Sequence, residues 1–384
     1  MTNKKYDILF VGSGLHNAVF ARLACDMGLK CLVIENRLHL GGNIYDEKID
    51  GINVHKYGAH IYHTSDENVW NFVNKYVKFN NYINSPIANY MGEIYNLPFN
   101  MNTFHQMWKD VITPTDAEER INSQKLHHNW EPKNLEEQAL TLVGKDIYTK
   151  LIKGYTEKQW GKYCVDLPPY IIKRLPVRFT YDNNYFNDKY QGIPVNGYSE
   201  LIEKLFEGCD VLLDTDYLKN REYYSTLAET IVYSGRIDSY FEYCHGELEY
   251  RSLKFNIETI YDCSNYQGNA VVNYTDSITP FTRIIEHKHF DVWNDDVKKL
   301  NYTIITKEYP VPYKDNDGFV INEPYYPIND EKNMSILKKY QDMSKYIENV
   351  IFGGRLAEYK YYDMDKVIKS AMNHINEYIK KVEN

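Results

Sequence analysis

The chain has 384 residues, of which 43% are hydrophobic and 25% charged, and its formal net charge is −9. This length predicts more than one structural unit, and the acidic balance argues against broad nucleic-acid binding, which needs a basic face. No apolar run reaches the roughly 18 residues of a membrane-spanning helix, and the N-terminal MTNKKYDILFVGSG indicates a buried strand in place of a signal peptide, so a cytoplasmic protein is expected.

The first elements predict a β-α-β unit. An apolar run over residues 6–11 indicates a buried parallel strand, and residues 15–27 carry apolar side chains at helical spacing and end near Gly28, a plausible helix terminator. Residues 31–34 indicate a second buried strand, closed by Glu35. A strand, a helix and a strand within about thirty residues are typical of a Rossmann-type nucleotide-binding unit.

The turn between the first strand and its helix predicts a dinucleotide site. Gly12 permits the tight turn, and Gly14, after Ser13, lets the backbone approach a pyrophosphate at the helix N-terminus. The third position of this fingerprint holds Asn17 where Gly or Ala is usual, so the helix is expected to lie further from the strand. Glu35 stands where a ribose hydroxyl would be held. A second flexible turn follows at Gly41-Gly42-Asn43, and this combination favours a flavoprotein over a nicotinamide dehydrogenase.

The remaining elements alternate between helical and strand-rich stretches. We expect strands and loops over 80–101, several helices over 103–159 with a start at Asn134, an ordered proline-rich loop over 167–184, antiparallel strands over 243–310, and helices over 333–346 and 365–381. Residues 350–352 indicate a short strand, followed by Gly353-Gly354-Arg355 and by Asp363 at the head of the last helix. Similarity to FAD-binding folds implies that this helix N-terminus faces the flavin ring, although Asp363 can equally serve only as a cap.

No metal site is expected. The six cysteines show no Cys-x-x-Cys pair and no zinc-finger spacing, so we interpret them as reduced, mostly buried thiols. His55, His60 and His63 lie close together in sequence, but no Cys or carboxylate completes a ligand set at suitable spacing.

Longer motifs identify a family. They include HKYGAHIYHT at 55–64, KGYTEKQWG at 153–161, IIKRLPVRFTYDNNYF at 171–186, TRIIEHKHF at 282–290 and FGGRLAEYKYYDM at 352–364. On these motifs the chain resembles the bacterial UDP-galactopyranose mutases over nearly its whole length.

The resemblance implies an α/β fold in three parts. Residues 1–80, 190–242 and 325–384 would form a discontinuous Rossmann-like FAD-binding domain. Residues 100–189 would form an inserted helical substrate domain with a mobile loop at 167–177, and residues 81–99 and 243–324 an antiparallel β-sheet domain.

The resemblance also implies a reaction. FAD, active in its reduced form, would attack the anomeric carbon through its N5 atom, with UDP as the leaving group, and so interconvert UDP-galactopyranose and UDP-galactofuranose. This isomerase would serve cell-surface polysaccharide biosynthesis, act as a homodimer, and take electrons from an external reductant such as NAD(P)H or a reductase.

The family's functional positions carry over residue by residue. Arg174 and Arg283 would hold the diphosphate and, with His60 beside the flavin, form the catalytic set. Tyr155 would stack on uracil, and Trp160 would lie near the sugar. The complete substrate set is Tyr155, Thr156, Trp160, Arg174, Tyr185, Asn273, Arg283, Tyr326 and Tyr361. The cofactor set is Gly12, Ser13, Gly14, Glu35, Arg37, Gly42, Asn43, His60, Arg355, Tyr361, Asp363 and Met364.

Two alternatives stay open at this point. The same mutase chemistry on UDP-N-acetylgalactosamine differs by one group on the sugar. An amine-oxidase-like flavin oxidoreductase shares the cofactor-binding architecture, but Arg174, Arg283 and the GYTEKQW motif argue against it.

Overall fold

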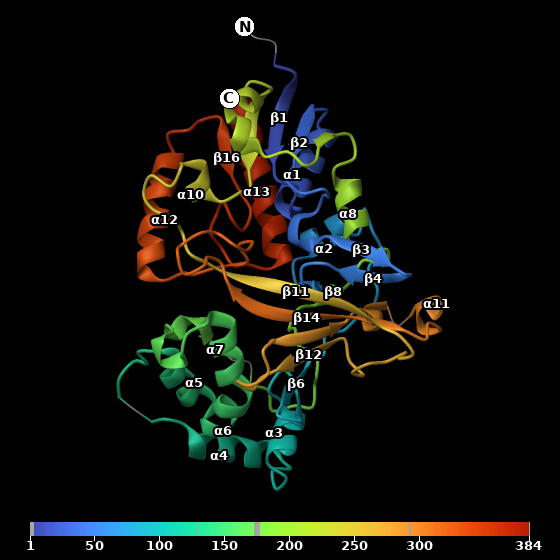
Figure 1. The fold of residues 1–384 in the computed structure, drawn as a ribbon, viewed down its shortest axis with the longest axis vertical. Helices are drawn as coiled ribbons and strands as arrows, with labels where there is room; N and C mark the ends of the chain where they lie inside the picture. Colours follow the sequence, from blue (N-terminus) through green and yellow to red (C-terminus); the bar gives the residue numbers. More distant parts are fainter. Residues whose placement is uncertain (1–3, 128, 173–176, 292, 384) are drawn as a thin grey trace.

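The computed structural model describes residues 4–127, 129–172, 177–291 and 293–383. Figure 1 shows a parallel sheet with its helices at one end of the molecule, a group of short helices at the other end, and a second, longer-stranded sheet between them. The predicted fold class, a Rossmann-like unit combined with a helical part and a second sheet, is confirmed.

The parallel sheet has five strands. Their order is β16 (Val350–Phe352), β10 (Ala228–Tyr233), β1 (Tyr6–Val11), β2 (Cys31–Ile34) and β9 (Asp210–Leu212). The central strands β1 and β2 are almost fully apolar because both faces of a parallel sheet are covered. The chain returns to this sheet from positions more than 200 residues apart, which places the last strand beside the first ones.

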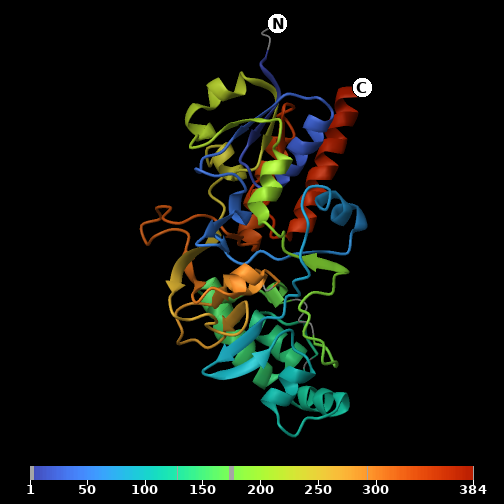
Figure 2. The same cartoon turned by 90° about the vertical axis from the view of Figure 1, so that its right-hand side faces the viewer.

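Helices cover one face of the parallel sheet. α1 (Leu15–Asp26) packs against α13 (Met364–Glu383) and α8 (Tyr198–Leu205), and Figure 2 shows α1 and α13 side by side. α1 ends as predicted, because Gly28 adopts a φ of +83°, which an L side chain would resist. The opposite face carries short helices: η5 (Tyr217–Asn220), α9 (Arg221–Ser225) and α10 (Ile237–Tyr240).

The second sheet has seven strands. Their order is β15 (Tyr326–Pro327), β11 (Tyr250–Ile260), β14 (Thr303–Pro312), β13 (Arg283–Glu286), β12 (Val271–Tyr274), β6 (Ile87–Tyr90) and β7 (Glu93–Asn96). One feature corrects the expectation of a purely antiparallel sheet, because β6 pairs with β12 in parallel. The β6–β7 hairpin enters from a distant part of the chain, so no tight turn dictates its direction relative to β12. Between β13 and β14 the chain also forms the helical turns η6 (His287–Asp291) and α11 (Asp295–Lys298).

The helical part has its own apolar core, separate from that of the parallel sheet. It comprises α3 (Met101–Met107), α4 (Pro114–Gln124), α5 (Leu135–Val143), α6 (Lys145–Ile147), the π-helical turn η2 (Tyr148–Lys153) and α7 (Gly154–Trp160). The predicted start at Asn134 is confirmed, since its side chain accepts a hydrogen bond from the Glu137 backbone. The helix predicted over 333–346 is α12 (Glu331–Ser344).

Smaller elements join the two sheets. They are β3 (Asp46–Ile49), β4 (Ile52–His55), β5 (Tyr62–Thr64), α2 (Glu67–Val73) and β8 (Tyr190–Gly192), with the short helix η1 (Gly42–Ile44). The short helices η3 (Cys164–Asp166) and η4 (Pro169–Ile172) pack on α5 in the helical part. β5 pairs with β8, which brings the segment after the helical part back beside the segment that follows β4. Within the described residues, no helix combines the length and apolar character that crossing a membrane requires.

Candidate active site

The predicted dinucleotide turn is a closed network of hydrogen bonds. Gly12 has a φ of +89°, and the backbone N–H and hydroxyl of Ser13 both donate to Glu35 Oε2, at 2.8 and 2.6 Å. Glu35 Oε1 accepts from the backbone N–H of Arg37 at 2.9 Å, and Gly41 donates to Ser13 Oγ at 3.1 Å. Glu35 therefore ties the first turn to the second one, and this buried carboxylate has its polar partners within the protein.

The start of α1 is open to an anion. A Cβ placed on Gly14 would meet nothing within 4 Å, and no side chain caps the first backbone N–H groups of the helix. On the far side of this space a Cβ on Gly42 would lie 3.2 Å from Gly14 Cα, so only glycine allows the two turns to approach. The guanidinium of Arg37 donates to Asn43 Oδ1 at 3.1 and 3.2 Å. This arrangement of free N–H groups, helix dipole and a nearby arginine suits a phosphate-bearing dinucleotide.

Asn17 connects α1 to the ends of β1 and β10 inside this turn. Its side chain is fully buried, and Nδ2 donates to the carbonyl oxygens of Val11 and Gly12 at 3.0 and 2.9 Å. It also contacts Ser234 Oγ at 3.2 Å. The extra volume of Asn is thus used for hydrogen bonds between the helix and the ends of β1 and β10. Sequence reasoning treated this residue only as a bulkier substitute and missed that role.

His60 lies in the loop between β4 and β5. Its Nδ1 is 2.9 Å from the carbonyl oxygen of Gly58, so Nδ1 carries the proton and donates. Burial lowers the pKa of His60 to about 3, and the neighbouring His55 and Arg355 lower it as well. The imidazole is consequently neutral at physiological pH. His63, three residues further along on β5, instead pairs its Nδ1 with Asp188 at 2.7 Å.

A row of side chains crosses the middle of the seven-stranded sheet. Asn273 on β12 is paired with Arg283 on β13, and Arg283 is paired with Glu308 on β14, so the three side chains share one face. Arg283 Nε lies 2.9 Å from Glu308 Oε2, with its N–H directed away from the oxygen, so the contact is an ion pair and not a hydrogen bond. Against the effect of burial, Glu308 raises the pKa of Arg283 further above its usual range. The guanidinium is a permanent charge at the centre of the sheet.

Glu308 also connects this row to the His60 loop. It accepts a hydrogen bond from the backbone of Ala59, and a Cβ on Gly58 would lie 2.9 Å from Glu308 Oε1. Burial raises the pKa of Glu308, while Arg283 and the Ala59 N–H oppose that rise. Glu308 was missed by the sequence reasoning. Its only signal was that it is the single acidic residue of β14, whose sequence is TIITKEYPVP.

α7 places aromatic side chains against the same row. Tyr155 OH accepts a hydrogen bond from Arg283 Nη2 at 3.1 Å, while Thr156 is buried and Trp160 packs on the helical core. Lys158 fixes this helix to the sheet, because its ammonium donates to the carbonyl oxygens of Tyr274, Thr279 and Phe281 at 2.8–3.0 Å. Burial lowers the pKa of Lys158 to about 8. Tyr155 and Arg283 are thereby held in one rigid arrangement.

Three more predicted tyrosines surround Arg283. Tyr326 packs edge-to-face on Tyr361, with ring centres 5.2 Å apart, and Arg355 lies over the Tyr361 ring at 5.3 Å. Burial raises the pKa of both Tyr185 and Tyr361, although their side chains are 41% and 63% exposed. We interpret this combination as two rings that line a recess open to solvent. Arg283 and Tyr155 influence both phenols, so all of these groups face the same space.

Several buried polar atoms around this space have no partner among the described residues. They are Asn84 Oδ1, Asn273 Oδ1 and Arg355 Nε, and Arg283 Nε has only its ion pair with Glu308. Buried polar groups are normally hydrogen-bonded, so such a concentration indicates that a polar ligand completes the site. Asn84 is a second residue that sequence reasoning missed, and nothing in its local sequence distinguished it.

Comparison with known proteins decides the family. A sequence profile described as UDP-galactopyranose mutase matches residues 150–361, and one described as an NAD(P)-binding Rossmann-like domain matches residues 11–76. The chain is 39% identical over 389 aligned residues to the probable UDP-galactopyranose mutase of Klebsiella pneumoniae, covering 100% of this chain and 97% of that protein. The chain belongs to the UDP-galactopyranose mutase family.

Two further comparisons describe the breadth of this family. The chain is 40% identical over 381 residues to the dTDP-fucopyranose mutase of Escherichia coli, covering 97% of this chain and 98% of that protein. A crystal structure of reduced UDP-galactopyranose mutase superimposes with a TM-score of 0.72 at 12% identity, over 99% of this chain and 95% of that one. The likeness to that structure shows the shared fold of the mutase family.

Of the remaining residues predicted for this mutase-family site, one lies outside the described residues and two lie at the start of α13. Arg174 lies outside the described residues, as does part of the 167–177 loop. Asp363 and Met364 are at the start of α13, where the Asp363 carbonyl oxygen accepts from the Val367 backbone at 3.0 Å. Met364 packs on the core of the parallel sheet, and Asp363 is exposed and interacts electrostatically with Tyr185 and Tyr361. The helix start therefore points its positive end toward the tyrosine side of the site.

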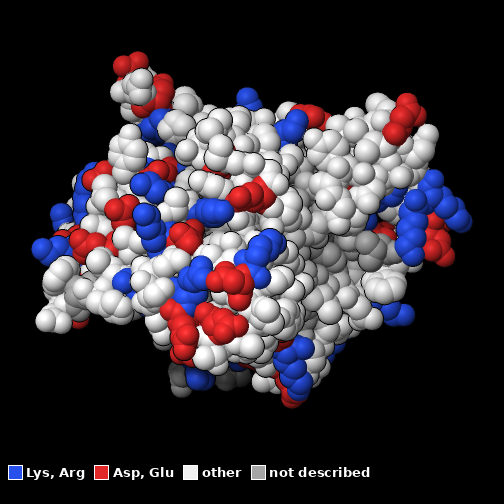
Figure 3. Space-filling view, turned by 90° about the horizontal axis from the view of Figure 1, so that it is seen from below, with Lys and Arg blue, Asp and Glu red and all other residues white. Residues whose placement is uncertain are grey.

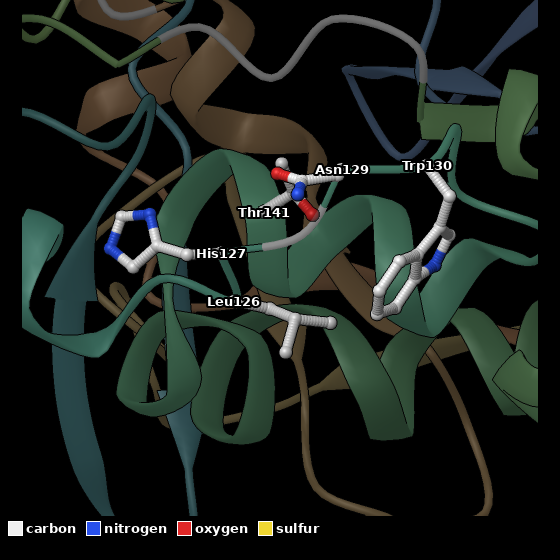
Figure 4. Close-up of a pocket in the computed structure, with 5 residues that line it drawn as sticks. All are labelled: Leu126, His127, Asn129, Trp130 and Thr141. Atoms are coloured by element: carbon white, nitrogen blue, oxygen red, sulfur yellow. The ribbon is translucent and has the colours of Figure 1, made fainter.

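A second hollow in the described part of this mutase-family chain lies away from these residues. This hollow on the helical part is lined by Leu126, His127, Asn129, Trp130 and Thr141, and Figure 4 shows these side chains around the connection between α4 and α5. It contains none of the predicted site residues. On the face shown in Figure 3, acidic and basic side chains are intermixed and form no basic patch for a nucleic acid.

Proposed function

We propose that this chain is an FAD-dependent mutase that interconverts UDP-galactopyranose and UDP-galactofuranose. The observation that carries the proposal is the row formed by Asn273, Arg283 and Glu308, with Tyr155 hydrogen-bonded to Arg283. A permanent positive charge, an aromatic ring and unpaired polar atoms in one recess match the diphosphate, the base and the hydroxyl groups of a nucleotide sugar.

The cofactor fits the residues present. The open space at Gly14 and the N–H groups at the start of α1 would receive the pyrophosphate, and Glu35, Arg37 and Asn43 flank the same turn. His60, Arg355, Asp363 and Met364 would hold the flavin end. Bound in reduced form, FAD supplies the nucleophilic nitrogen that the anomeric carbon requires.

The protein's own groups perform the remaining tasks. Arg283 holds negative charge on the diphosphate while the bond to the sugar is broken and remade, and Glu308 keeps the guanidinium in place. Tyr155 orients the nucleotide by stacking, and Tyr326 and Tyr361 line the space for the sugar. The neutral His60 gains a proton only where an anionic group binds beside it, because burial opposes its charged form.

Other expectations belong to the same proposal. Arg174 and the 167–177 loop close over the nucleotide, an external reductant such as NAD(P)H or a reductase maintains the reduced flavin, and the protein is a cytoplasmic homodimer in cell-surface polysaccharide biosynthesis. The oxidase alternative loses its support, because the family of the chain is that of a mutase.

A second candidate substrate has an observation in its favour. The Escherichia coli relative named dTDP-fucopyranose mutase is 40% identical, close to the 39% of the Klebsiella pneumoniae protein. That substrate would differ in base, ribose and sugar, and UDP-N-acetylgalactosamine in one sugar substituent. The recess lined by Tyr185 and Tyr361 is where the differences in the sugar would be recognised, and Tyr155 is where the difference in the base would be.

One assay tests the proposal. Dithionite-reduced protein is incubated with UDP-galactofuranose, dTDP-fucofuranose or UDP-N-acetylgalactofuranosamine, and the pyranose products are quantified by chromatography. We expect the highest kcat/KM with UDP-galactofuranose and negligible turnover by oxidised protein. Preferred conversion of the dTDP sugar would transfer the assignment to that substrate, and equal rates in both redox states would overturn the role of reduced flavin.

A further inference from the structure

Three of the six cysteines converge at one place in the fold. The Sγ atoms of Cys25, Cys31 and Cys209 all lie within 4.8 Å of one another, and the Cys25 and Cys209 sulfurs are 3.5 Å apart. All three are free thiols. This corrects the expectation of mostly buried cysteines, since Cys31 is buried but Cys25 and Cys209 are only partly covered. Their sequence separation gave no sign of a cluster.

The topology of the parallel sheet creates the cluster. β2 and β9 are neighbouring strands in which Leu32 is paired with Asp210. The residues that precede this pair, Cys31 and Cys209, therefore lie opposite each other. Cys25 lies in the last turn of α1, and its sulfur is close to those of Cys31 and Cys209. The cluster is therefore at the C-terminal end of a 12-residue helix whose other end opens the dinucleotide turn. At about 1.5 Å per residue, the two ends are about 16 Å apart, so the cluster is not part of the catalytic recess.

The spacing of the three sulfurs suits a single metal ion. Metal–thiolate bonds of about 2.3 Å place sulfurs roughly 3.8–4.0 Å apart in tetrahedral or trigonal geometry. The Cys25 and Cys209 sulfurs are 3.5 Å apart, and no pair of the three exceeds 4.8 Å, so a small adjustment would bring them to this spacing. Arg22, one turn before Cys25 on α1, pairs its guanidinium with Asp26 at 2.6 Å.

We propose that Cys25, Cys31 and Cys209 bind one thiophilic metal ion, and that Cu(I) suits the site best. Soft thiolates select Cu(I), zinc and iron–sulfur centres among biological metals. Structural zinc normally takes four protein ligands, and within the described part of the chain no fourth Cys, His, Asp or Glu joins this group. A trigonal set of three sulfurs satisfies Cu(I). The partly covered Cys25 and Cys209 give the ion a path from solvent to the buried Cys31.

The test is a Cu(I) titration of the flavin-loaded protein under anaerobic conditions. The background is Cys244→Ser with Cys263→Ser, which removes two solvent-accessible thiols outside the cluster. The protein competes with a chromogenic Cu(I) chelator, and a parallel titration uses Zn(II) with a zinc indicator. We expect one retained Cu(I) per chain and a sulfur-only ligand shell by X-ray absorption.

Cys25→Ser and Cys209→Ser, each added to that background, are the deciding variants. Each should weaken Cu(I) retention by more than the roughly 10–100-fold cost of losing a mere supporting group, because each removes a ligand. A rise in melting temperature on adding Cu(I) should occur only when the three thiols are intact, which separates ligand loss from misfolding. Unchanged retention in both variants, absence of retained Cu(I) in the background protein, or retention of Zn(II) in preference to Cu(I) would overturn the proposal.

Discussion

The dinucleotide turn and the row around Arg283 both contain buried charged groups, but these groups are stabilised in different ways. In the turn, Glu35 accepts three hydrogen bonds from Ser13 and Arg37. Around Arg283, by contrast, a buried ion pair is surrounded by polar atoms without partners among the described residues, such as Asn273 Oδ1. Folding alone supplies the partners of Glu35, whereas the polar atoms around Arg283 gain partners only when a ligand binds. Unsatisfied groups thus distinguish the place of recognition from the place of structural support.

Among the substitutions that test this difference, we expect the largest effect at Arg283. Arg283→Ala leaves Glu308 as an uncompensated buried carboxylate, so we expect the free energy of unfolding to fall by about 3–5 kcal/mol and turnover to be lost. Adding Glu308→Gln should restore much of the stability and none of the turnover. Urea denaturation and the mutase assay on both variants check this. Recovery of activity in the double variant would show that Arg283 acts only through Glu308.

A change in the closed turn should damage the protein before any ligand is added. In Glu35→Gln an amide nitrogen replaces one accepting oxygen, and loss of a charged hydrogen bond costs about 1.5–3 kcal/mol. We expect a lower melting temperature and loss of flavin during gel filtration, with Glu47→Gln on the partly exposed strand β3 as the control. A variant with normal melting temperature and bound flavin would show that Glu35 does not organise the turn.

His60 lies between the two regions and gives a pH signature. Its folded pKa of about 3 is below the usual 6.5, so its contribution to stability is complete above pH 6.5 and is lost as pH falls below that value. Wild-type protein should therefore lose about 1.4 kcal/mol per pH unit more than His60→Gln between pH 6.5 and 4.5. Urea denaturation at several pH values measures both slopes. Parallel slopes would mean that His60 is solvated and titrates normally.

Tyr155 tests whether the open region binds the base of the nucleotide. Tyr155→Ala should weaken UDP binding about five-fold or more, equivalent to about 1 kcal/mol, because stacking on the base is lost. The hydrogen bond from Arg283 to Tyr155 OH adds a second term, so Tyr155→Phe should also lose affinity, although less. Calorimetry with UDP and melting temperatures of both variants separate stacking from packing. A lower melting temperature with unchanged UDP affinity would assign Tyr155 to the helical core.

Asn273 should give the smallest change in stability and so sharpen the comparison. Asn273→Val removes a buried carbonyl oxygen that has no partner among the described residues and places a β-branched side chain in a strand. We expect the free energy of unfolding to stay within about 1 kcal/mol of wild type, or to rise, while UDP-galactose affinity falls. A large loss of stability would show that Asn273 supports the fold.

The sequence allowed accurate prediction where structure is local. Gly12, Ser13, Gly14 and Glu35 lie within one β-α-β unit, and their spacing alone predicted their common turn. The row of Asn273, Arg283 and Glu308 depends on strand pairing between distant segments, which no short pattern records, so Glu308 was missed although Arg283 was found by resemblance to the family. The same limit explains the unexpected parallel pairing of β6 with β12 and the cluster of Cys25, Cys31 and Cys209.

The pairing of β12, β13 and β14 limits how the position of Arg283 can change among related proteins. A slip of one residue turns Arg283 to the opposite face, so only slips of two residues preserve the chemistry, and each moves the charge by about 6.6 Å along the strand. A nucleotide sugar that differs by a methyl or hydroxyl group requires a far smaller adjustment. Diversification of substrates in this fold is therefore expected at rings outside the three central strands, such as Tyr185 and Tyr361, while Arg283 stays where the sheet places it.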